Sequence, residues 1–183
     1  MSYATLLEIE NIPQDLMKDP LDWFFAEHYR QRQFYRLVGE LATVTAFDGD
    51  RVTRLLDFLR HDLALHVIDE EEDLFPLLRR RALPEDEVEQ VLDLLSTEHR
   101  SDMTQAQTLR GHLEACLLER KAPGLEPRAR KVMQNFAAQA LRHLALENAV
   151  VLPIARLRLS AEDLLALGRR LAARRGVVLE VSA

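Results

Sequence analysis

Two histidine–glutamate pairs are the residues of this sequence that are best suited to chemistry. His66 and Glu70 are four residues apart, and so are His143 and Glu147. Side chains at this spacing lie on the same face of an α-helix, one turn from each other. Imidazole nitrogens and carboxylate oxygens are both ligands of divalent transition metals, so each pair is a candidate for part of a metal site.

The surroundings of the two pairs are also repeated. Residues 66–76 and 143–153 both match the pattern H-x-x-x-E-x-x-x-x-[FL]-P. A Glu-His dipeptide precedes each of them, ending at His28 and at His99. The dipeptides are displaced by 71 residues and the pairs by 77, which indicates an internal repeat of two helix pairs.

Residue counts place these groups at one level of a helical bundle. His28 lies 20 residues before the turn near Asp48, and His66 lies 18 residues after it. At about 1.5 Å per helical residue, the two differ by only about 3 Å along the bundle. Similar counts around the other connections bring the remaining groups to the same level. The predicted core layer contains four histidines and two glutamates: His28, His66, Glu70, His99, His143 and Glu147.

Six such groups in an apolar layer need a partner, because a buried carboxylate or imidazolium is costly when it is unpaired. Four imidazoles and two carboxylates suit two metal ions, each with two histidines and both carboxylates bridging. A solvent bridge would then leave one position open on each metal. Sites of this kind in bundle cores typically hold di-iron or di-manganese. We therefore expect two metal ions in this layer, iron or manganese, for which zinc can substitute.

The elements that must position these groups are helices. Apolar residues recur at helical spacing, the chain has only 6 glycines, and alternation with period two is almost absent. Asp19-Pro20 and Ser160 have the residue types of helix starts. The prediction is an all-α, up-down-up-down antiparallel four-helix bundle with an additional short C-terminal helix. The helices are expected at about 20–45, 51–80, 84–119, 127–158 and 160–175, with a loose extended tail over 177–183.

Composition narrows the class of protein. A length of 183 residues suits one domain over residues 1–183, with the bundle at about 20–158. The formal net charge of −6 argues against a nucleic-acid partner. The N-terminal residues contain no basic region followed by an apolar stretch, and no apolar run is long enough for a membrane span. One cysteine, Cys116, fits a reducing compartment, so the expected location is the cytoplasm.

Two further acids are candidates for a layer of groups around the metal ligands. Asp62 lies one turn before His66, and Glu98 directly precedes His99. Either carboxylate is placed to orient a ligand imidazole or to line an access path for metal or protons. The other charged residues near the motifs are assigned to exposed faces: His61, Glu71, Glu72, Asp73, Arg169, Arg170, Arg174 and Arg175.

The order of these motifs resembles the hemerythrin-like, or HHE cation-binding, family. The resemblance covers about residues 22–153 and implies a four-helix bundle with a non-haem di-iron centre at the six residues of the core layer. Oxygen-carrying hemerythrins have a second histidine one turn from the third-helix ligand, where this sequence has Leu95 or Met103. The four-histidine, two-glutamate set is more similar to the bacterial branch that includes di-iron proteins for repair of iron–sulfur clusters under nitrosative stress.

Three functions fit these observations. The first is a di-iron protein that binds or senses a small diatomic ligand, dioxygen or nitric oxide, or that handles iron. The second is a di-iron redox enzyme in oxidative or nitrosative stress defence or in cluster repair. The third is a helical interaction module with a structural metal, for a protein partner that the sequence does not identify. Open coordination positions favour the first two, because a structural site does not need them. The sequence leaves open whether the chain is an enzyme.

Overall fold

The computed structural model describes residues 9–179, and their regular structure is helical. No strand occurs among these residues. Residues 177–179 have no regular structure, and the rest of the tail expected over 177–183 lies outside the described residues. None of the helices within 9–179 is both long and apolar enough to span a bilayer.

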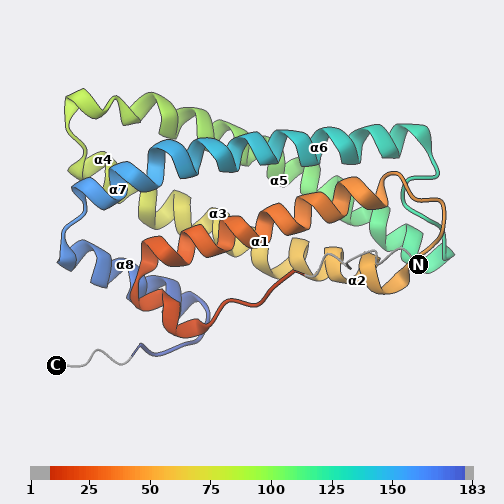
Figure 1. Cartoon of the computed structure of the whole chain (residues 1–183), viewed down its shortest axis with the longest axis horizontal. Coiled ribbons are helices and arrows are strands. Elements are labelled where there is room, and N and C mark those ends of the chain that lie inside the picture. Colours follow the sequence, from red (N-terminus) through yellow and green to blue (C-terminus); the bar gives the residue numbers. More distant parts are fainter. Residues whose placement is uncertain (1–8, 180–183) are drawn as a thin grey trace, which may run out of the picture.

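Four long helical segments run alternately up and down a bundle, and a shorter helix packs beside the end where the first segment begins (Figure 1). The second and fourth segments, residues 49–81 and 127–158, are each interrupted by π-helical turns and therefore carry several labels. The predicted all-α bundle with an additional C-terminal helix is confirmed. The helices are α1 (Pro20–Leu41), α2 (Gly49–Asp57), α3 (Leu63–Asp69), α4 (Phe75–Arg81), α5 (Val88–Glu119), α6 (Pro127–Leu146), α7 (Leu152–Arg158) and α8 (Ala161–Arg174).

Short turns of other helix types complete these segments. Turns of 3₁₀ helix at Gln14–Lys18 and Pro84–Asp86 lead into α1 and α5. The π-helical turns are Phe58–Asp62, Glu70–Leu74 and Glu147–Val151, and the chain continues as helix on both sides of each. Because a π turn holds about one residue more than an α turn, it rotates the residues after it by roughly 100° relative to those before it.

Side-chain capping groups mark the starts of α1 and α8. The Asp19 carboxylate accepts a hydrogen bond from the Asp22 amide at 3.3 Å, and Pro20 is the first residue of α1. At the start of α8, the Ser160 hydroxyl accepts from the Asp163 amide at 3.1 Å, and the Asp163 carboxylate accepts from the Ser160 amide at 3.0 Å. These reciprocal bonds form the capping box that the sequence predicts.

Two helix ends differ from the prediction. The first helix ends at Leu41, about four residues early, where Gly124 of a connecting loop lies against Ala42. A Cβ on Gly124 would be 2.1 Å from the Ala42 carbonyl oxygen, so this loop occupies the space beyond the helix end. The third helix begins at Val88, about four residues late, because Glu87 has a left-handed backbone (φ 48°) that separates the preceding turn from the helix.

A polar layer divides the apolar core into two clusters. On α1, for example, Phe24 belongs to one cluster and Phe34 to the other. On the second segment, Leu63 and Leu74 are separated in the same way. Buried polar side chains lie between the clusters on all four segments. They include the predicted site residues His28, His66, Glu70, His99, His143 and Glu147.

The C-terminal helix α8 is closely docked on the bundle. It packs against α1 and the turn Gln14–Lys18, where Leu167 and Leu171 are fully buried. Gly168 faces Met17 so closely that a Cβ would lie 2.4 Å from the Met17 carbonyl oxygen. Leu167 and Leu171 belong to the second apolar cluster, the one that contains Phe24 and Leu74, so α8 is a fixed part of the domain.

Candidate metal centre

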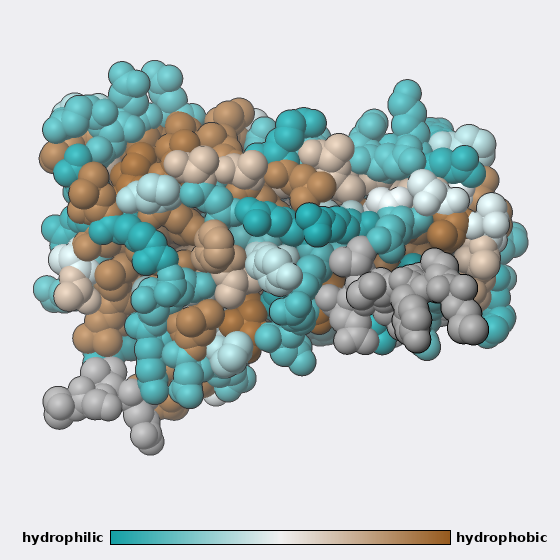
Figure 2. Space-filling view, viewed as in Figure 1, coloured by the Kyte–Doolittle hydropathy of each residue, from teal (hydrophilic) through white to brown (hydrophobic). Residues whose placement is uncertain are grey.

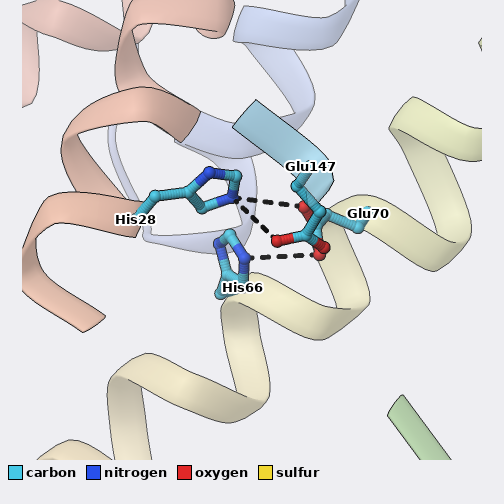
Figure 3. Close-up of side chains that lie close together, drawn as sticks. All are labelled: His28, His66, Glu70 and Glu147. Carbon is cyan, nitrogen blue, oxygen red and sulfur yellow. Dashed lines mark ion pairs between the residues drawn. The ribbon is translucent and has the colours of Figure 1, made fainter. Parts of the chain in front are cut away.

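The polar layer brings the six predicted site residues into one cluster. Figure 3 shows four of them facing one another: His28 from α1, His66 from α3, and Glu70 and Glu147 from the first positions of two π turns. One ligand atom of each lies within 4.8 Å of the others. The Nε2 atom of His28 is 3.5 Å from a carboxylate oxygen of Glu70 and 3.5 Å from one of Glu147.

The remaining two histidines lie against the same carboxylates. His99 from α5, His143 from α6 and Glu147 form a second group whose ligand atoms lie within 4.8 Å of one another. The Nε2 atoms of His99 and His143 are 3.0 Å apart. The His143 Nε2 is 2.8 Å from Glu147, and the His99 Nε2 is 3.3 Å from Glu70. Both carboxylates therefore reach both groups of histidines, as bridging ligands must.

Each of the four imidazoles is oriented by an oxygen acceptor outside the cluster. Three of these acceptors are carboxylates, which can only accept a hydrogen bond, so the imidazole Nδ1 carries the proton. The Nε2 lone pair then points to the centre, which is the tautomer that a metal ligand needs. The Nδ1–oxygen pairs are His28–Asn148 (3.0 Å), His66–Glu27 (3.0 Å), His99–Glu71 (2.6 Å) and His143–Glu98 (2.8 Å).

These acceptors follow the internal repeat of the sequence. In each half of the chain, the residue directly before the first histidine orients the histidine of the next long segment. The residue directly after each motif glutamate orients the first histidine of the other half. The corresponding acceptors of the two halves are Glu27 with Glu98, and Glu71 with Asn148.

The two acids predicted to surround the ligands have different places in the structure. Glu98 orients an imidazole, that of His143 on the neighbouring segment. Asp62 instead accepts a hydrogen bond from the Arg30 guanidinium at 2.7 Å. The reason is that the His66 imidazole directs its Nδ1 toward α1, where Glu27 lies, and not along its own helix.

The repeated motif distorts the helix at the carboxylates of both Glu70 and Glu147. The Phe75 amide donates to the Glu70 carbonyl, and the Leu152 amide donates to the Glu147 carbonyl, each five residues back. The motif proline is the next residue in both cases, and it has no N–H to donate. A change of helical hydrogen-bonding pattern costs little at that point, because one bond is missing in any case. Both glutamates therefore begin a π turn, a distortion that is frequent at functional sites.

The donor atoms of the cluster fit metal cations. Both carboxylate oxygens of Glu70, both of Glu147 and the Nε2 of His28 are fully buried and have no hydrogen-bond partner in the described structure. Leaving a buried polar group unsatisfied costs about 1–3 kcal/mol, and more if it is charged. Nitrogen and oxygen atoms about 3 Å apart suit a cation bound at roughly 2.0–2.2 Å from each. A metal would satisfy all of these atoms at once.

Electrostatics also indicate that this layer needs positive charge. Burial acts to lower the pKa of His99, but the nearby carboxylates of Glu147 and Glu70 outweigh it and raise the pKa to about 12. Burial likewise opposes protonation of His66, yet the charge of Glu70 raises its pKa well above the usual value. Burial acts to raise the pKa of Glu70, but the neighbouring His66 brings it well below its usual range. At neutral pH the metal-free cluster therefore balances its carboxylates with protons on the imidazoles.

Metal uptake is therefore expected to release protons. The pKa of His66 is raised well above its usual value and that of His99 to about 12, so these two side chains are charged at pH 7 in the metal-free protein; the carboxylate of Glu147 also raises the pKa of His143 against the effect of burial. Only neutral imidazole binds a metal, so binding should weaken as the pH falls, and loading should release about two to three protons per chain. Calorimetric titration with zinc, in two buffers of different ionisation enthalpy, measures this number. Uptake without proton release would contradict the proposed ligand set.

Fold and cluster together define a helical-bundle domain with a buried histidine–glutamate cation site. The family model described as hemerythrin HHE cation binding domain matches residues 19–155. This chain belongs to that family, as the order of its motifs predicts. A comparison with curated proteins found no significant match. The matched segment contains all six clustered residues and ends before α8 begins.

Proposed function

We propose that this protein holds two non-haem iron ions and uses them to bind or sense a small diatomic ligand, dioxygen or nitric oxide. The observation that carries the proposal is the donor set, in which two glutamates reach two pairs of histidines. That set is too large for one tetrahedral ion and suits two ions that share both carboxylates. Handling of iron itself is the simpler variant of the same function.

The ligand assignment follows from the distances within the cluster. His28 and His66 lie in the group that contains both glutamates, and they are placed to hold one ion. His99 and His143 face each other across the second group and are placed to hold the other ion. When bound, two irons of this kind supply open coordination positions and exchangeable electrons to a small ligand.

A small cavity beside the histidines supports a ligand of this size. It has a volume of about 20 Å³ and is lined by His66, His99 and His143 together with residues of all four long segments. Roughly 10–15 Å³ is enough to hold one water, so the cavity has room for a molecule of about two atoms. The polar or polarizable side chains among the other lining residues are Gln31, Tyr35, Asp102 and Met103.

Two of these side chains are able to hold a ligand by hydrogen bonding. The Gln31 Nε2 is buried without an acceptor among the described residues. Burial, together with the nearby charge of Asp102, raises the pKa of Tyr35 well above its usual value, so its hydroxyl stays protonated. The hydroxyl is 3.4 Å from Gln31 Oε1, and both groups line the cavity. They are therefore placed to orient a ligand beside the histidines.

A redox enzyme is the second candidate, and Asp102 favours it. This buried side chain lines the same cavity and accepts a hydrogen bond from the Gln139 amide at 3.1 Å. Burial raises its pKa, which makes the carboxyl group a better proton donor at neutral pH than an exposed aspartate. Reduction of a small oxygen or nitrogen compound consumes protons, so a carboxyl group at this place suits an enzyme better than a carrier.

Iron content and the response to nitric oxide test the proposal together. Protein from iron-supplemented cells is expected to contain about two irons per chain. Adding nitric oxide to the reduced protein under anaerobic conditions should change its optical spectrum, because an open position at each iron accepts this ligand. Elemental analysis and absorption spectroscopy measure the two quantities.

Each alternative gives a different result in this experiment. A ratio that stays at one metal per chain under iron loading would contradict the two-metal assignment. Two irons whose spectrum is unchanged by nitric oxide and by dioxygen would favour a structural metal in an interaction module. Sustained consumption of nitric oxide or peroxide in the presence of a reductant would favour the enzyme.

A further inference from the structure

The residue that follows α8 connects the C-terminal helix to the metal centre. The Nη2 of Arg175 is 2.8 Å from the Glu27 Oε1 and 2.7 Å from the Asp69 Oδ2. The other oxygen of Glu27, Oε2, accepts the hydrogen bond from the His66 Nδ1 at 3.0 Å. A continuous line of contacts therefore leads from the guanidinium through Glu27 to a metal ligand.

The side chains of this connection are buried and are held by short contacts. The side chains of Glu27, Asp69 and Arg175 are 7%, 0% and 13% exposed. The guanidinium also lies 5.0 Å from the centre of the Trp23 ring and donates to the Leu171 carbonyl at 3.1 Å. Glu27 and Asp69 share this one cation, so its loss would remove a partner from two buried carboxylates at once.

Other arginines of α8 bind the same acidic face but have different partners. Arg170 donates to Asp73 at 2.9 Å. Arg174 donates to Asp73 at 2.9 Å and also pairs with Asp69. Arg175 is the arginine of this group whose described contacts include Glu27. Arg170 is therefore a natural control, since it has the same charge and lies on α8, the helix that Arg175 directly follows.

We propose that Arg175 is a positioning residue for the metal ligand His66, which it holds in place by fixing Glu27. A partner that orients a ligand imidazole tunes both its direction and its basicity, so a loose Glu27 weakens the metal bond of His66. α8 thereby controls how long the metal is retained. α8 lies outside the segment that matches the family model, so membership of the family does not imply this control. The inference rests on the metal binding proposed above, but not on iron or on a diatomic ligand.

Metal release from variants of the full chain tests this inference. Each protein is loaded with zinc and mixed with an excess of a chelator that changes colour when it binds zinc. Arg175→Gln is expected to release zinc about tenfold faster than the unmodified protein, at the low end of the effect of such partners. Arg170→Gln should stay within about twofold, because its loss leaves Glu27 in place. Equal acceleration in the two variants would overturn the inference.

Two further variants separate positioning from general loosening. Arg175→Lys returns a charged nitrogen to the place of Nη2, so its release rate should be within about threefold of the unmodified protein even if the glutamine variant folds poorly. In a Glu27→Gln background, Arg175→Gln should add less than about a twofold change, because the two residues act through one path. Effects that multiply in the double variant would overturn the inference. Failure of the unmodified protein to take up zinc would instead overturn the metal centre itself.

Discussion

Replacing Glu147 with alanine is expected to empty the metal centre and to lower the thermal stability of protein prepared with metal. Glu147 belongs to both groups of ligand atoms, so its loss removes a donor from each ion. A metal bound at a thousand times its dissociation constant contributes about 4 kcal/mol to the free energy of unfolding. Loss of that contribution should lower the Tm by roughly 10 °C in a domain of this size. Elemental analysis and a thermal melt, each with and without chelator, measure both effects.

The controls for this prediction come from both halves of the repeat. Glu70→Ala should behave like Glu147→Ala, because the internal repeat gives the two carboxylates equivalent places. His61 is exposed and lies outside the cluster, so His61→Ala should leave metal content and Tm unchanged. In metal-free protein, the Tm values of the variants should differ less from one another than they do in protein prepared with metal. If His61→Ala emptied the site while His66→Ala left it full, the assigned register of the second segment would be incorrect.

The sequence was sufficient to predict the cluster because helical geometry is regular. A fixed rise per residue converts residue counts from a turn into a level along the bundle. That arithmetic predicts His28 and His66 in one layer, and the structure brings their Nε2 atoms to the same carboxylate, that of Glu70. The errors of about four residues at the end of α1 and at the start of α5 do not affect the predicted level of the ligands, because both of these helix ends lie more than two turns from the ligand histidine.

Contacts between helices were harder to predict than positions along them. Helical spacing predicts Asp62 as the orienting carboxylate because it is one turn from His66, whereas the true acceptor, Glu27, belongs to α1. The acidic run predicts an exposed face for Glu71, yet its carboxylate accepts a hydrogen bond from the His99 imidazole at 2.6 Å. Which side of a ring faces which neighbour depends on helix rotation and on π turns, which periodicity does not reveal. The repeat itself contained the missing signal, because each true acceptor directly precedes or follows a predicted ligand.

The charged residues of the C-terminal helix illustrate the same limit. Arginines in the last turn of a helix suggest an exposed face, and the run Glu71 to Asp73 suggests another. In the structure these two sets meet, so that Asp73 is 3% exposed and is paired with Arg170 and Arg174. Opposite charges on distant segments of one chain are candidates for ion pairs. Which of them pair is seen only in the structure, where α8 is docked on the bundle.

Placing a histidine at Met103 is expected to slow the reaction of the reduced protein with small ligands. Met103 is one turn after His99 on α5 and lines the small cavity together with His99 and His143. The other candidate position, Leu95, is fully buried in the second apolar cluster and does not line this cavity. An imidazole at residue 103 would enter the cavity and compete for the position that a diatomic ligand needs. The expected slowing is roughly tenfold, equivalent to about 1.4 kcal/mol in the barrier.

Stopped-flow mixing of reduced protein with nitric oxide or with oxygenated buffer measures these rates. Met103→Leu is the matched control, because it keeps an apolar side chain of similar size and adds no ligand. It should react as fast as the unmodified protein. In the unmodified protein both irons are expected to be open, so reaction with dioxygen should be fast and should not reverse when dioxygen is removed. A spectral change that does reverse would contradict this expectation and would favour a carrier, because only a carrier must return its ligand unchanged.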